Sequence, residues 1–195
     1  YILEYKNVYY NFLEMLAKNN GISALDYLDE MVSNYGLSEN ATKKIVCNGE
    51  NLLFEIDDNL TVKVKNLSTF NYVNLSNPSF VDTADALKYF NDLTNEVRHQ
   101  IDKFKEAYQT KRTWNVATFN ANILSNPILS KIANTLVWGA YDNKDTLIKM
   151  YSSVHEIISE DNHDVKLALV HPVELNNITL PQYKFEPFKQ INKQV

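Results

Sequence analysis

The chain has 195 residues, 45% of them hydrophobic and 22% charged, and a formal net charge of −5. This length can bury a sizeable core in one large domain or two small ones. The acidic balance disfavours a duplex-binding protein, and no apolar run approaches the roughly 18 residues of a membrane span. A single cysteine, Cys47, excludes an internal disulfide and a cysteine-cluster zinc site, and it indicates a reducing compartment.

Residues 1–35 are predicted to form two helices. Apolar residues recur at helical spacing in both parts: Val8, Phe12 and Met15, then Leu25, Leu28, Val32 and Tyr35. Ser23 with Asp26 is typical of a helix start, and Gly36 is typical of a helix end.

Apolar and polar residues alternate over residues 51–65, which predicts a β-hairpin with its turn at 57–59. Residues 66–81 show no period and are predicted to be a loop. The clearest helix is expected over residues 82–111, with Asp82 as its N-cap. One apolar stripe runs along it: Ala86, Phe90, Leu93, Val97, Ile101, Phe104 and Tyr108.

A further helix is expected from Thr113, including Trp114 and Phe119. Asn126-Pro127 is typical of a helix start. Beyond residue 137 the pattern predicts an antiparallel meander of short strands at residues 137–141, 147–151, 155–159 and 166–170.

These elements predict an α+β fold: a helical N-terminal part with a β-hairpin, a long central helix, and a small C-terminal antiparallel sheet. We expect residues 1–195 to form one domain, with a possible sub-division into 1–81 and 82–195. Because the chain begins with Tyr1 rather than Met, we expect it to be a fragment of a larger protein.

Few residues suggest chemistry. His171-Pro172 with Glu174 is compatible with a general base, but a turn at a strand end explains it as well. Neither His155 nor His163-Asp164 has the spacing of a metal site. Cys47 follows two apolar residues, which favours a small buried side chain over a nucleophile.

Two further features have a functional and a structural interpretation. The basic residues Lys103, Lys105, Lys111 and Arg112 fit an acidic partner or nucleic acid, but we favour a solvated helix face whose last-turn cations complement the helix dipole. The apolar stripe of the long helix fits a partner seam, but we favour internal core.

Four short motifs follow one another in the last half of the chain: Arg112-Thr113-Trp114 with Phe119, Leu136 to Gly139 with Trp138, His171-Pro172 with Leu175, and Glu186-Pro187-Phe188-Lys189-Gln190. In order and spacing they resemble the bacterial MolR-like proteins, whose C-terminal domain has no known function and occurs beside WGR modules. Glu186 stands where that family usually has Gln.

The resemblance implies a non-catalytic interaction or regulatory domain of a large bacterial cytoplasmic protein, without cofactor or metal. Its partner would be another domain of the parent chain or another protein, and we expect an exposed aromatic patch that includes Trp138 or Phe188. Two alternatives stay open. One is an enzyme whose polar site joins His171, Glu174, Arg112 and Glu186. The other is a nucleic-acid-associated module.

Overall fold

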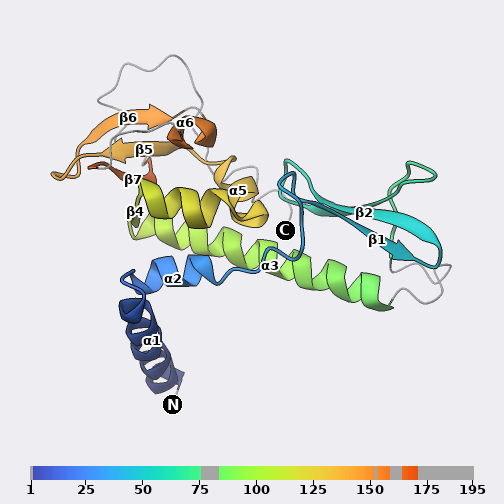
Figure 1. Cartoon of the computed structure of the whole chain (residues 1–195), viewed down its shortest axis with the longest axis horizontal. Coiled ribbons are helices and arrows are strands. Elements are labelled where there is room, and N and C mark those ends of the chain that lie inside the picture. Colours follow the sequence, from blue (N-terminus) through green and yellow to red (C-terminus); the bar gives the residue numbers. More distant parts are fainter. Residues whose placement is uncertain (1, 76–83, 152, 159–163, 171–195) are drawn as a thin grey trace.

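The computed structural model describes residues 2–75, 84–151, 153–158 and 164–170. Over these ranges helices combine with two antiparallel sheets, which confirms the predicted α+β class. The sheets lie at opposite ends of a long helix, α3, and α1 projects away from the rest (Figure 1). In the described ranges no helix is both long and apolar enough to cross a membrane.

The N-terminal pair of helices is confirmed as α1 (Ile2–Asn19) and α2 (Ala24–Glu30). As predicted, Ser23 caps α2, because its hydroxyl oxygen accepts a hydrogen bond from the amide of Asp26 at 3.1 Å. Gly36 does not end this helix, since α2 stops at Glu30. Its φ of +66° serves a later turn instead.

The first sheet contains β1 (Thr42–Cys47), β2 (Glu50–Ile56) and β3 (Val62–Asn66) in that order. The predicted hairpin is therefore confirmed, and β1 is an additional strand. Alternate residues of β2 and β3 are buried, as the period of two requires: Leu52, Phe54, Ile56, Val62 and Val64. The predicted loop is partly paired, because Tyr72 forms an isolated bridge with Lys65.

Helix α3 (Ala84–Gln109) confirms the long helix, while its predicted cap, Asp82, lies outside the described residues. Most of its apolar stripe is buried: Ala86, Leu93, Val97, Ile101 and Phe104. The stripe is therefore internal core, as we favoured, and not a partner seam.

The helix expected from Thr113 begins later than predicted. Thr113–Asn115 is a strand, β4, which pairs with β7 (Lys166–Leu169), so the prediction was wrong for Trp114. Asn115 then caps α4 (Val116–Thr118), accepting a hydrogen bond from the amide of Thr118 at 2.6 Å. The chain continues as a π-helix, η1 (Phe119–Leu124), and then as α5 (Pro127–Ala133), whose predicted start at Asn126 is confirmed.

The second sheet joins β4 to β5 (Trp138–Tyr141), β6 (Leu147–Tyr151) and β7 (Lys166–Leu169). It is antiparallel as expected, but its order β4-β7-β5-β6 is not a meander, because β7 lies between β4 and β5. The strand predicted at residues 155–159 was also wrong. Helix α6 (Val154–Ile158) occupies this segment, with Val154 and Ile157 buried at helical spacing.

Within the described ranges, the buried residues form one large cluster and one smaller cluster. The large one includes Leu37, Ala41 and Ile56 from the N-terminal part together with Leu93 and Trp138 from the C-terminal part. The smaller one lies between the first sheet and the start of α3. Packing is therefore continuous across the boundary near residue 81.

Candidate functional site

Arg112 and Trp114 of the Arg-x-Trp motif form hydrogen bonds with a buried carboxylate. Asp29, at the end of α2, is 6% exposed. Its Oδ1 accepts a hydrogen bond from NH1 of Arg112 at 3.2 Å, and its Oδ2 accepts from NH2 of Arg112 at 2.6 Å and from Nε1 of Trp114 at 2.9 Å. The guanidinium also contacts Asp26 at 3.2 Å and lies 4.4 Å from the centre of the Trp114 ring. Both motif residues therefore hold α2 against the body of the protein.

Trp138 of the second motif belongs to a buried aromatic cluster. Its ring centre lies 4.6 Å from that of Phe119 and 5.4 Å from that of Trp114, with Phe104 packed beside them. Trp138 is 1% exposed and donates its Nε1 hydrogen to the carbonyl oxygen of Ala133 at 3.0 Å. The exposed patch that we expected therefore does not include Trp138.

Gly139 follows within the same strand, where there is no room for a side chain. A Cβ atom at this position would clash with the side chain of Leu147 and would lie 2.9 Å from that of Val170. The Leu-Val-Trp-Gly motif thus combines a core ring with a place of close packing, and both features serve the fold.

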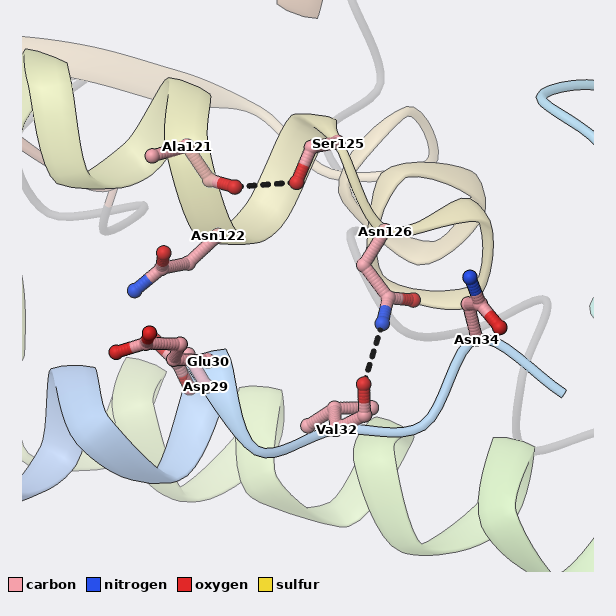
Figure 2. A pocket seen from close by; sticks show the side chains of 8 residues that line it. All are labelled: Asp29, Glu30, Val32, Asn34, Ala121, Asn122, Ser125 and Asn126. Atoms are coloured by element: carbon pink, nitrogen blue, oxygen red, sulfur yellow. Dashed lines mark hydrogen bonds between the residues drawn. The ribbon is translucent and has the colours of Figure 1, made fainter.

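A polar hollow of about 210 Å³ opens beside Asp29, between α2 and the segment η1–α5. Figure 2 shows its lining, with Asp29 and Glu30 of α2 on one side of the space and Asn122 on the other. The amide group of Asn122 donates to the carbonyl oxygen of Asp26 at 3.1 Å, and that of Asn126 donates to the carbonyl oxygen of Val32 at 2.9 Å. These bonds hold the two walls together.

The hollow offers hydrogen bonding rather than acid–base chemistry. Both oxygens of Asp29 are already bonded to Arg112 or Trp114, so this carboxylate is engaged in holding the fold together. The lining contains no cysteine or histidine, and within the described part of the chain no three His, Cys, Asp or Glu residues gather as a metal site. The groups present suit a small polar ligand or the backbone of a peptide.

The remaining predicted site residues have different outcomes. His171, Pro172, Glu186, Pro187, Phe188 and Gln190 lie outside the described residues, as do Glu174 and His163. The convergence of the proposed enzyme set on one point therefore stays a prediction. Cys47 is only half-buried, at the end of β1, and packs against the smaller core cluster.

The basic cluster has only part of the arrangement that we favoured, because Lys103 and Lys105 lie on α3 whereas Lys111 and Arg112 do not. Helix α3 ends at Gln109 and carries no basic residue in its last turn. Lys111 and Arg112 follow the helix, and Arg112 is committed to Asp29 and Asp26. Arg112 is therefore part of a structural ion pair, because the chain turns back after α3 and places the guanidinium against α2.

Sequence reasoning missed Asp29 and Asn122, and it predicted Asn126 only as a helix start. The available signal was weak: Asp26 and Asp29 stand three residues apart, which places two carboxylates on one face of α2. Nothing local distinguishes such a pair from solvated surface charges.

A family model described as "Domain of unknown function (DUF4132)" matches residues 76–195. The chain is 22% identical over 184 residues to the uncharacterized protein YehI of Escherichia coli strain K12. The aligned region covers 84% of this chain but only 15% of YehI. No solved structure matches the chain. Because the family model covers more than half of it, the chain belongs to the DUF4132 family.

Proposed function

We propose that this chain is a non-catalytic interaction domain of a larger bacterial cytoplasmic protein of the MolR-like type. Helix α1 would be its docking element, and the partner would be another domain of the same protein. A regulatory role would follow if this contact changes with the state of the parent protein.

The exposed apolar side of α1 carries the proposal. Val8, Phe12 and Met15 are 67%, 52% and 52% exposed, and Tyr9 beside them is 55% exposed. Leu13 and Ala17, on the opposite side of the helix, are buried at 5% and 1%. A contiguous apolar surface of this kind usually marks a site of protein contact.

Two observations favour a domain of the parent protein as the occupant. The chain corresponds to only 15% of YehI, so this relative has a large amount of additional chain that could supply a partner surface. Val8, Phe12 and Met15 carry no charge. An uncharged apolar surface suits a permanent contact between domains of one chain better than association with a separate protein, which charged residues usually accelerate.

Site-specific photo-cross-linking in the complete natural protein tests the proposal. A photoreactive amino acid at Phe12 is expected to form intramolecular cross-links to a region outside residues 1–195. The same group at Glu14, on a polar side of α1, is the matched control and should cross-link much less.

A second arm uses the double variant Phe12→Glu, Met15→Glu. Both side chains are exposed, so the free energy of unfolding of the 195-residue chain should change by no more than about 0.5 kcal/mol. In the complete protein, α1 should lose its protection from hydrogen exchange. Equal cross-linking at Phe12 and Glu14, or cross-links only to a second copy, would overturn the proposal.

A further inference from the structure

The solvent-facing side of the first sheet carries aromatic rings beside lysines. Phe70 and Tyr72, in the segment after β3, are 70% and 62% exposed. The ammonium nitrogen of Lys65 lies 5.7 Å from the centre of the Phe70 ring, and that of Lys63 lies 5.4 Å from the centre of the Tyr72 ring. Each ring thus has a cation next to it.

The register of the sheet places a third lysine on the same side. Lys44 of β1 stands opposite Leu53 of β2, which stands opposite Lys65 of β3. Directly opposed residues point to the same face of a sheet, so Lys44 and Lys65 lie about 10 Å apart, or two strand spacings. Lys44 and Lys65 form no salt bridge within the described ranges.

The carboxylates on this side already have partners. Glu55 accepts a hydrogen bond from the hydroxyl of Tyr72 at 3.0 Å, and Asp57 pairs with Lys63 at 2.6 Å. Because the hydroxyl of Tyr72 is neutral, Glu55 keeps its negative charge, and Lys44 and Lys65 together with Glu55 leave this face a small positive excess, although the whole chain has a net charge of −5.

The loop that carries Phe70 is built to hold its ring outward. The side-chain oxygen of Asn66 accepts hydrogen bonds from the amides of Ser68 and Thr69 at 2.8 and 3.2 Å. The amide of Phe70 donates to the carbonyl oxygen of Asn66 at 2.8 Å. Phe70 has a φ of +60°, a backbone conformation that bulky residues rarely adopt, so this exposed position is imposed by the loop.

From this geometry we infer that the outer face of the first sheet, formed by Lys44, Lys63, Lys65, Phe70 and Tyr72, binds single-stranded nucleic acid. Bases stack on the two rings, and Lys44 and Lys65, which form no salt bridge in the described ranges, contact the phosphates. Lys65 lies beside the Phe70 ring, as the phosphate of a nucleotide lies beside its base. Stacking on aromatic rings within a positively charged surface is the general mode of single-strand binding. This site is separate from the proposed docking side of α1.

Fluorescence anisotropy with labelled 12-nucleotide oligothymidine and oligouridine tests the inference on the 195-residue chain. Phe70→Ala should weaken binding about tenfold and leave the salt dependence unchanged, because the ring contributes stacking. Lys65→Gln should also weaken binding, but it should lower the slope of log K against log salt by about 0.7, the value for one phosphate contact with a single strand.

Tyr10→Ala and Lys88→Gln are the matched controls, an exposed tyrosine on α1 and an exposed lysine on α3. Neither should change the affinity. The inference is overturned if no oligonucleotide binds at low salt, or if Phe70→Ala binds like the unmodified chain. It is also overturned if polyglutamate or anionic lipid vesicles bind as well as the oligonucleotides do.

Discussion

Asp29 joins the N-terminal helices to the C-terminal half of the described structure. Its carboxylate is buried and takes three hydrogen bonds from Arg112 and Trp114. Burying a carboxylate costs free energy, and this cost is offset only while both partners are in place. Removing Asp29 would leave the guanidinium of Arg112, which is 13% exposed, with Asp26 as its remaining acidic partner.

Asp29→Ala is therefore expected to lower the free energy of unfolding by about 3–5 kcal/mol, the usual cost of breaking a buried ion pair. Urea titration followed by tryptophan fluorescence measures it. The control is Asp58→Ala, which removes an ion pair to Lys131 of 2.7 Å whose carboxylate is 97% exposed. That loss should not exceed about 1 kcal/mol. Similar losses in both variants would show that Asp29 is not a structural anchor.

At the scale of elements, two hairpins share one turn design. In the β2–β3 turn, Oδ1 of Asp57 accepts hydrogen bonds from the amides of Asn59 and Thr61, both at 2.9 Å. In the β5–β6 turn, Oδ1 of Asp142 accepts from the amides of Lys144 and Thr146 at 2.8 and 2.9 Å. The residue before each threonine has a positive φ.

These bonds lower the pKa of both carboxyl groups. Burial alone would raise the pKa of Asp57, but the hydrogen bonds from Lys63 and from the turn amides outweigh burial. For Asp142 the amides of Thr146 and Lys144 are the main cause of the lowered pKa. A lowered pKa in the folded state stabilises the protein above the unfolded-state value of 3.8, and this stability is lost as the pH falls through the folded-state pKa.

The double variant Asp57→Asn, Asp142→Asn should thus lose less stability than the unmodified chain as the pH falls from about 5 to 2. Urea titrations at several pH values over this range give the comparison. Asn143→Ala, in the same turn but without a titrating group, should keep the slope of the unmodified chain. If the double variant keeps that slope as well, the two turns do not contribute to acid sensitivity.

At the scale of the molecule, the hydrophobic core includes residues that lie outside the segment matched by the family model. The DUF4132 match begins at residue 76, whereas Asp29, Leu37 and Ala41 lie before it and are buried against residues that follow it. We therefore expect that residues 76–195 alone do not fold cooperatively, because they lose part of their core and the partner of Arg112. Thermal unfolding by circular dichroism compares this truncation with residues 1–195. A sharp transition at an unchanged midpoint would contradict the expectation.

Local physics made several elements predictable. The stripe of α3 repeats at helical spacing, Asn126-Pro127 starts α5 through its own hydrogen bonds, and β2 and β3 alternate. Each signal acts within a few residues, so it can be read without knowing the rest of the chain.

The other features depend on distant segments. Trp114 lies in a strand because β7, about fifty residues later, pairs with it, and Arg112 is an anchor because Asp29, 83 positions earlier, meets it. The apolar side of α1 has the same spacing as a core face, yet the fold leaves Val8 and Phe12 exposed. Periodicity shows that a helix has an apolar side, whereas only the packing of remote parts decides whether that side is covered.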